Sequence, residues 1–261
     1  GRRDRVVTSG HSLRSPLQGV TSTIERRIVG VRSHQLAILI LTAHFILGIF
    51  YSVAVPIWEA HDEEGHYAYV RYLATHHALP PPGEKITEWR DESHQPPLYY
   101  LLGALATFWI DTSEGLNLVP NPHTQTGQGG VNLFVHSDEE AFPYRGIPLA
   151  VHVARLVSVS ISTLVVAITY LLGRFIFPDR EEIAIGAMAL NAFWPQFLFV
   201  GSVVTNDALV PLFSSLVLLF LLRVANLRGS WRDFLGLGAA LGAGLVTKRN
   251  ALTLLPLAAI V

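Results

Sequence analysis

Long apolar runs separated by short polar segments dominate this chain, and they predict membrane-spanning helices. A helix needs about 20 mostly apolar residues to cross a bilayer. By that criterion, we expect a basic tail over residues 1–33 and a helical module over 34–261. The predicted spans cover about residues 36–58, 156–173, 183–204, 208–226, 232–247 and 251–261, the last of them truncated.

Composition supports the same class of protein. Half of the residues are hydrophobic and 15% are charged, against about 25% charged in soluble domains. We therefore predict an all-α polytopic membrane protein. The absence of cysteine excludes disulfides and thiolate metal sites. Because the chain starts at Gly1 and stops inside an apolar run, we expect it to be part of a longer protein.

Charge is unevenly distributed, and this distribution predicts the orientation. The first 33 residues hold seven Arg against one Asp and one Glu, which places the N-terminus in the cytoplasm by the positive-inside rule. The basic loops at 174–180 and 223–232 also lie in the cytoplasm if the short apolar run 97–110 does not cross the membrane. If that run did cross, both loops would face outward. We therefore expect residues 97–110 to form an interfacial helix within one extracytoplasmic loop, residues 59–150. That loop holds thirteen acidic residues, four Lys or Arg and seven His.

The segment "EAHDEEGH", residues 59–66, resembles a zinc-protease motif but does not fit one. Such a motif needs two histidines four residues apart, whereas His61 and His66 are five apart. Asp62 and His66, by contrast, share one face of a predicted amphipathic helix. The segment leaves two readings of Asp62 open: a helix N-cap, which the spacing alone favours, or a functional carboxylate.

Three further segments carry polar groups at the same predicted membrane face. Asp207 lies where the third predicted span ends, either as a helix cap or as a functional acid. Lys248 and Arg249 follow the fifth span, where they suit a phosphate group or snorkel to lipid headgroups. His94 precedes a Pro-Pro pair and is either a ligand or a solvated loop residue.

The order of these motifs resembles that of a GT-C glycosyltransferase, in the group that contains protein O-mannosyltransferases and lipid A aminoarabinose transferases. The resemblance extends from about Ile28 to Val261. Five segments carry it, in this order: "PIWEAHDEEGHYAYVRYLATHHALP", "HQPPLYYLLGAL", "ARLVSVSISTLVVAITYLLGRFIF", "VVTNDALVPLF" and "FLGLGAALGAGLVTKRNAL".

The resemblance implies an inverting sugar transfer from a polyprenyl-phosphate donor to a lipid, glycan or protein acceptor at the extracytoplasmic face. It implies that Asp62 is the general base, that Glu63 supports it, and that Asp207 holds the acceptor or a metal. Lys248 would stabilise the carrier phosphate. The remaining candidates for binding the phosphate or the acceptor are Arg249, Arg155, His94 and His66.

A non-enzymatic polytopic protein, either a transporter or an assembly scaffold, is the alternative function. A transporter would place ionisable groups near the bilayer midplane, where only His44 is expected. A divalent metal is conceivable because of the loop histidines, but their spacing specifies none. We expect the bilayer as a partner and no nucleic acid.

Overall fold

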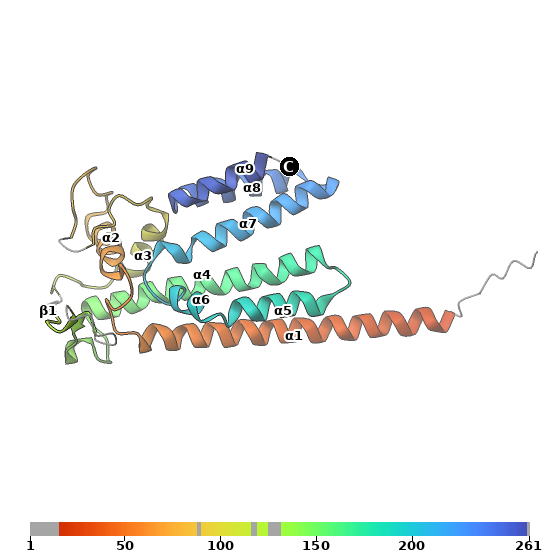
Figure 1. Cartoon of the computed structure of the whole chain (residues 1–261), viewed down its shortest axis with the longest axis horizontal. Helices are drawn as coiled ribbons and strands as arrows, with labels where there is room; N and C mark the ends of the chain where they lie inside the picture. Colours follow the sequence, from red (N-terminus) through yellow and green to blue (C-terminus); the bar gives the residue numbers. More distant parts are fainter. Residues whose placement is uncertain (1–15, 88–89, 116–118, 125–131, 260–261) are drawn as a thin grey trace, which may run out of the picture.

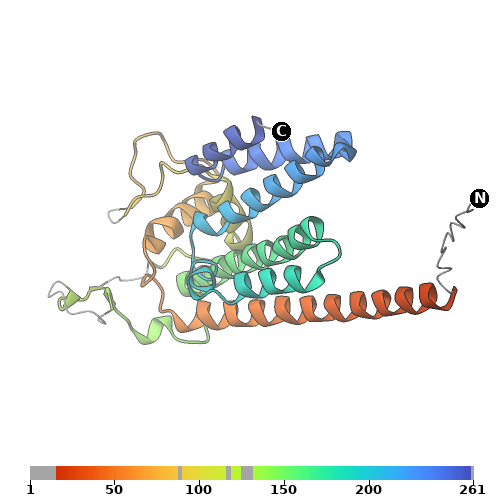
Figure 2. The same ribbon diagram turned by 45° about the vertical axis from the view of Figure 1, so that its right-hand side comes forward.

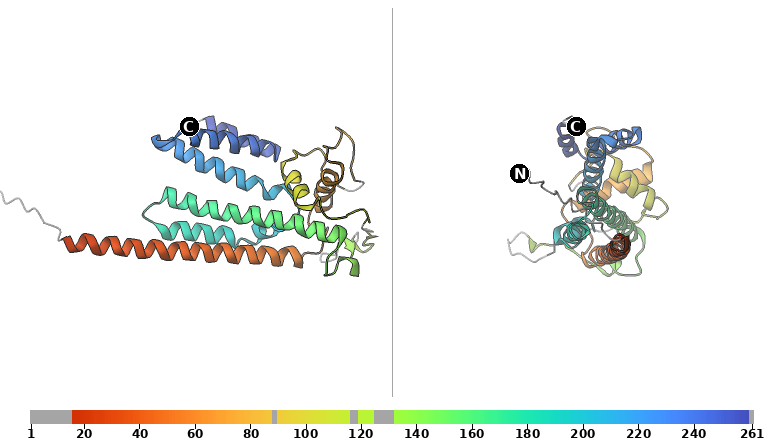
Figure 3. Two further views of the ribbon diagram at one scale, coloured as in Figure 1. Left: turned by 180° about the vertical axis from the view of Figure 1, so that it is seen from behind. Right: turned by 90° about the vertical axis from the view of Figure 1, so that its right-hand side faces the viewer.

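Most of the helices lie side by side along the long axis of the molecule (Figure 1). The computed structural model describes residues 16–87, 90–115, 119–124 and 132–259. In the end-on view of Figure 3 the long helices are seen nearly down their axes. The helices are α1 (Pro16–Ala54), α2 (Glu63–His76), α3 (Leu98–Thr107), α4 (Gly146–Ile176), α5 (Glu181–Ala192), α6 (Pro195–Val200), α7 (Val210–Arg223), α8 (Trp231–Leu245) and α9 (Leu254–Ala259).

Short elements connect and extend these helices. Strands β1 (Val119–Pro120) and β2 (Phe134–Val135) pair antiparallel, with Val119 opposite Val135. The 3₁₀ segments are η2 (Asp138–Glu140), η3 (Asn206–Ala208) and η5 (Arg249–Thr253), and η4 (Val224–Arg228) is a π-helical turn. Figures 1 and 2 show α2, α3 and β1 at the end of the bundle where α1 stops and α4 begins.

Three helical segments of the described residues are long and apolar enough to cross a membrane: Ser33–Ala54, Gly146–Ile176 and Asn206–Asn226. The prediction of an all-α polytopic membrane protein is thereby confirmed. The run 97–110, predicted as an interfacial helix, contains α3, which is too short to cross.

Proline sets two of the helix boundaries. The predicted span 183–204 is divided into α5 and α6 because Pro195 occupies the first turn of α6 and Trp194 before it is extended. Helix α1 ends at Ala54, four residues before the predicted end of the first span at residue 58, since Val55 precedes Pro56 and cannot readily continue the helix.

Helix α4 is the centre of the bundle and packs against α1, α3, α5 and α7. At the end of the bundle that carries α2 and α3, one buried cluster joins these two helices to α4 and to Val204 and Leu209, which flank η3. Tyr99 and Tyr100 are almost fully buried in it. The Tyr99 hydroxyl is hydrogen-bonded to Ser158 Oγ at 2.7 Å and accepts the Thr205 backbone N–H at 3.1 Å. The segment before α7 is therefore fixed against α3 and α4.

Candidate active site

Asp62 lies at the mouth of the bundle, in the turn between α1 and α2. Trp58 and Asp62 both adopt left-handed backbone conformations, with φ of 72° and 58°, and non-glycine residues rarely do so. The interpretation of Asp62 as a side-chain N-cap is wrong, because its carboxylate accepts no N–H from α2. Its Oδ1 instead lies 2.5 Å from Arg90 Nη1, and its Oδ2 lies 3.0 Å from His61 Nε2. The carboxylate thus faces Arg90 and His61 and not the helix end.

Glu63, the next residue, is fully buried against Arg155. Arg155 Nε donates to Glu63 Oε1 at 2.7 Å, and Nη2 donates to Oε2 at 2.5 Å. The remaining bonds of Arg155 go to main-chain carbonyls of Ser52, Val55 and Pro56 at the end of α1. With no exposed surface on either side chain, the pair connects α1, α2 and α4 from within.

His66 occupies the centre of the candidate site. Its Nδ1 is hydrogen-bonded to the Tyr100 hydroxyl at 2.8 Å, and its ring stacks on the Tyr100 ring. Burial lowers the pKa of His66 to about 4, while Asp207 and Asp62 oppose and Lys248 reinforces that effect. His66 Nε2 also lies 3.4 Å from Thr205 Oγ1, so His66 connects the helix that follows Asp62 with the segment that carries Asp207.

Asp207 and Lys248 form an ion pair across 41 residues of sequence. Thr205, not Asp207, caps η3, since its hydroxyl accepts the Asp207 backbone N–H at 3.2 Å. The Asp207 side chain is therefore free to face Lys248, and it remains 52% exposed. The structure thus brings Asp207 and Lys248 together at the end of the bundle that carries Asp62.

The remaining predicted residues lie at the edges of this group. Asn206 is fully buried, and its amide nitrogen lies 3.4 Å from Gln95 Oε1. This contact brings the segment that contains His94 close to η3. His94 itself is exposed, and so is Arg249, which begins η5 directly after Lys248.

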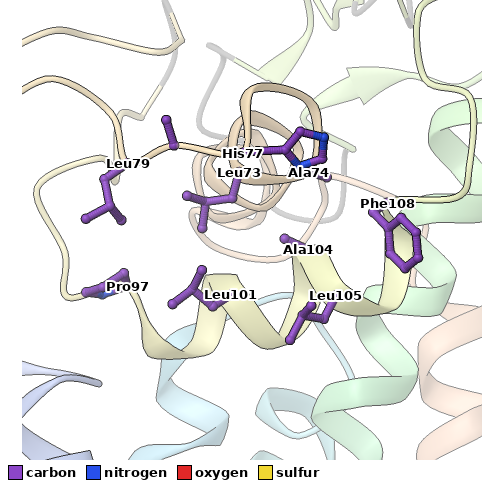
Figure 4. A pocket seen from close by; sticks show the side chains of 10 residues that line it. Leu73, Ala74, His77, Leu79, Pro97, Leu101, Ala104, Leu105 and Phe108 are labelled. Atoms are coloured by element: carbon purple, nitrogen blue, oxygen red, sulfur yellow. The ribbon is translucent and has the colours of Figure 1, made fainter.

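Two cavities adjoin the site and differ in polarity. One, of about 270 Å³, lies beside Asp62 and Arg90. The other, of about 530 Å³, lies between α2 with its following loop and α3 (Figure 4). Figure 4 shows apolar side chains from both sides facing this second cavity, with His77 as its polar residue. The lining residues are Leu73, Ala74, His77, Ala78, Leu79, Pro97, Leu101, Ala104, Leu105 and Phe108.

The loop histidines have separate partners in the structure. His136 lies between two carboxylates, 2.6 Å from Glu140 Oε2 and 2.9 Å from Glu59 Oε1. His61 contacts Asp62, and His76 stacks on Tyr72. Across the described part of the chain, no group of three His, Asp or Glu side chains is arranged to hold a metal ion.

Comparison with known proteins supports the resemblance that the motifs indicated. The family described as dolichyl-phosphate-mannose-protein mannosyltransferase matches residues 150–261. No curated protein and no solved structure matches the chain. The matched region contains Arg155, Asp207 and Lys248. The similarity to GT-C glycosyltransferases is thus confirmed for this part of a membrane protein.

Proposed function

We propose that the protein transfers a sugar from a polyprenyl-phosphate donor to a hydroxyl group of an acceptor at the extracytoplasmic face. One observation carries the proposal. Asp207 is paired with Lys248. Asp62 precedes the helix that carries the buried His66, and His66 Nε2 lies 3.4 Å from Thr205 Oγ1, two residues before Asp207. Two carboxylates and a cation at one mouth of a membrane bundle suit acid–base chemistry next to a phosphate ester.

In the proposed reaction, the acceptor oxygen attacks the anomeric carbon while Asp62 takes the hydroxyl proton. The bond from that carbon to the phosphate oxygen breaks, and its electron pair leaves with the polyprenyl phosphate. Lys248 stabilises the charge that develops on this leaving group, and Asp207 orients Lys248. Attack from the side opposite to the phosphate inverts the anomeric configuration.

Glu63 and Arg155 act as positioning residues in this proposal. Their buried pair fixes the turn that holds Asp62, and Glu63 Oε1 also accepts the Val204 N–H at 2.9 Å. Val204 lies three residues before Asp207, so one carboxylate connects both segments that carry the reactive acids. Misplacing such groups by about 1 Å can cost about 100-fold in rate.

The apolar cavity between α2 and α3 suits the polyprenyl chain of the donor. Its Pro97 end adjoins the C-terminal end of α8, because the Leu98 N–H donates to the carbonyl of Val246, the residue after this helix, at 3.1 Å. Val246 lies two residues before Lys248. A chain in this cavity would therefore end near the cation that is proposed to hold its phosphate.

The same arrangement supports the proposed orientation. The candidate site lies at the end of α1 opposite to its N-terminal part (Figure 1). Because the Arg-rich N-terminal segment belongs in the cytoplasm by the positive-inside rule, the site faces the extracytoplasmic side.

The alternative of a transporter or scaffold has less support. A transporter needs ionisable groups near the midplane of its spans. His44 is such a residue, but both of its ring nitrogens are engaged, with the Ala192 carbonyl at 2.8 Å and Ser162 Oγ at 3.1 Å. This histidine is a satisfied packing residue.

The test is consumption of a polyprenyl-phosphate sugar by the full chain in membranes, with Asp62→Asn as the comparison. We expect the variant to lose about 100-fold or more in turnover, as is usual when a general base is removed, while donor binding is retained. Unchanged turnover in Asp62→Asn would remove Asp62 as the base. A complete lack of donor consumption by the unmodified protein would refute the transferase function. NMR of the product would report inversion.

A further inference from the structure

The loop between α2 and α3 is held tightly against the first turn of α2. A Cβ atom at Gly65 would lie 1.6 Å from the Arg90 carbonyl oxygen, so the loop backbone occupies the space of a side chain. The Thr87 hydroxyl also donates to Glu64 Oε1 at 2.6 Å. The main chain at Arg90 is therefore fixed in place, and its side chain projects from an anchored position.

The ion pair between Arg90 and Asp62 is exposed and easily exchanged. The Arg90 side chain is 60% exposed and the Asp62 side chain 23%, and ion pairs in such settings contribute little net stability. Among the described residues, the side-chain contacts of Arg90 are made by Nη1, which lies 2.7 Å from His61 Nδ1 and donates to Asp62 Oδ1. A guanidinium group offers five N–H donors in a planar fork that matches carboxylate and phosphate. Arg90 thus has spare capacity for a second oxyanion.

The cavity of about 270 Å³ next to this pair has both polar and apolar walls. Asp62 and Arg90 line it together with Trp58 and Leu133. Trp58 Nε1 is buried and has no hydrogen-bond partner in the described part of the chain, and Trp58 also lines a smaller pocket beside Tyr67. Buried polar groups are normally paired, so this unpaired donor close to Arg90 suits a ligand that accepts hydrogen bonds.

We propose that this cavity binds an oxyanion of the acceptor, a phosphate or a carboxylate, and that Arg90 exchanges Asp62 for it. The inference rests on the proposed function, in which Asp62 is the base. Before binding, Arg90 occupies Asp62 Oδ1. Transfer of Arg90 to the acceptor anion releases Oδ1 to take the hydroxyl proton. The acceptor is therefore a hydroxyl compound that carries a phosphate or carboxylate near the hydroxyl.

The donor phosphate is assigned elsewhere, so the two anions do not compete for one cation. Lys248 is paired with Asp207 and does not line the cavity beside Asp62. Arg90 is therefore the cation that binds the acceptor anion in the cavity beside Asp62. The polyprenyl phosphate that leaves is bound separately, by Lys248.

Binding of inorganic phosphate and of acetate to the purified full chain tests this inference without any need for turnover. Calorimetry in a Lys248→Gln background removes the cation of the donor site. In that background, Arg90→Gln is expected to weaken binding of the preferred anion by about tenfold or more. Lys85→Gln, which changes an exposed cation of the same loop, is the matched control and should leave binding unchanged. Asp62→Asn should strengthen binding, because Arg90 loses its competing carboxylate.

Equal binding in the Arg90→Gln and Lys85→Gln proteins would overturn the inference, and so would unchanged binding in Asp62→Asn. Arg90→Lys, which keeps the charge, should retain part of the affinity for the anion. Partial binding by this variant would show that the weaker binding of Arg90→Gln is not caused by misfolding. Whichever of phosphate and acetate binds with the higher affinity identifies the class of anion that the acceptor carries. These measurements are independent of sugar transfer, so their failure leaves the transferase function standing. Conversely, a lack of donor consumption by the unmodified protein would refute the transferase function without altering the binding result.

Discussion

Glu63 and Arg155, 92 residues apart in sequence, form a two-pronged ion pair with no solvent exposure on either side chain. Isolated buried charges are very unfavourable, and only full hydrogen bonding makes a pair tolerable. Here each guanidinium nitrogen donates to a carboxylate or main-chain oxygen. Glu63 in turn accepts main-chain N–H groups of Trp58 and Val204. The pair therefore organises the backbone around Asp62.

Removal of one charge from this pair should destabilise the protein strongly. We expect Arg155→Met to cost about 3–5 kcal/mol of unfolding free energy, because Glu63 is left buried without its partner. Thermal unfolding in detergent measures the loss. The exposed pair of Arg180 and Glu182 provides the control, and Arg180→Gln should leave the melting temperature unchanged. An equally small effect of Arg155→Met would show that the buried pair is not needed for stability.

The local sequence predicted the all-α membrane fold, but it did not predict which residues each candidate side chain would contact. Apolar runs and motif order were sufficient to expect Asp62, Asp207 and Lys248 at one membrane face. Arg155 was expected to bind the phosphate or the acceptor, yet its hydrogen bonds go to Glu63 and to main-chain carbonyls inside the protein. No spacing rule pairs residue 155 with residue 63, since that contact depends on how α4 packs against the end of α1.

Arg90 was not predicted from the sequence, for a related reason. It lies in a loop 28 residues after Asp62, and loop conformation is not encoded in hydrophobic periodicity. The closest local signal is Gly65, which interrupts the first turn of a helix that otherwise reads as amphipathic. Glycine is unfavourable inside helices, and the close approach of the Arg90 carbonyl explains its presence.

His66 should make the protein less stable in acid. Its folded pKa is about 4 because of burial, against about 6.5 in the unfolded chain. The unfolded state therefore binds more protons between these values, and stability falls as the pH drops through this window. The loss is about 2 kcal/mol at pH 5.

Melting temperatures at pH 7 and pH 5 test this effect. His66→Gln should show a smaller decrease between the two pH values than the unmodified protein. His77, which is exposed beyond α2, serves as the control, since His77→Gln should retain the full decrease. If His66→Gln and the unmodified protein lose the same stability, then His66 is not the group responsible.

Gly65→Ala should displace the Arg90 loop while leaving α2 helical. The new methyl group would collide with the Arg90 carbonyl, although alanine favours the helix by about 1 kcal/mol over glycine. We expect faster proteolysis of the loop and loss of oxyanion binding. Gly238→Ala, where a Cβ meets nothing within 4 Å among the described residues, should leave both properties unchanged. Intact loop protection in Gly65→Ala would contradict the close packing.

Lys248 should determine how tightly the donor binds. Loss of a charged hydrogen bond costs about 1.5–3 kcal/mol, so Lys248→Gln should weaken donor affinity by about ten- to a hundredfold. Lys248→Arg keeps the charge and should restore part of that affinity. Lys85→Gln is again the control, because Lys85 is exposed in the loop and has no role in the proposal. Donor KM and kcat, measured with a polyprenyl-phosphate sugar, separate binding from chemistry. Donor affinity in Lys248→Gln equal to that in Lys85→Gln would place the phosphate elsewhere on the protein.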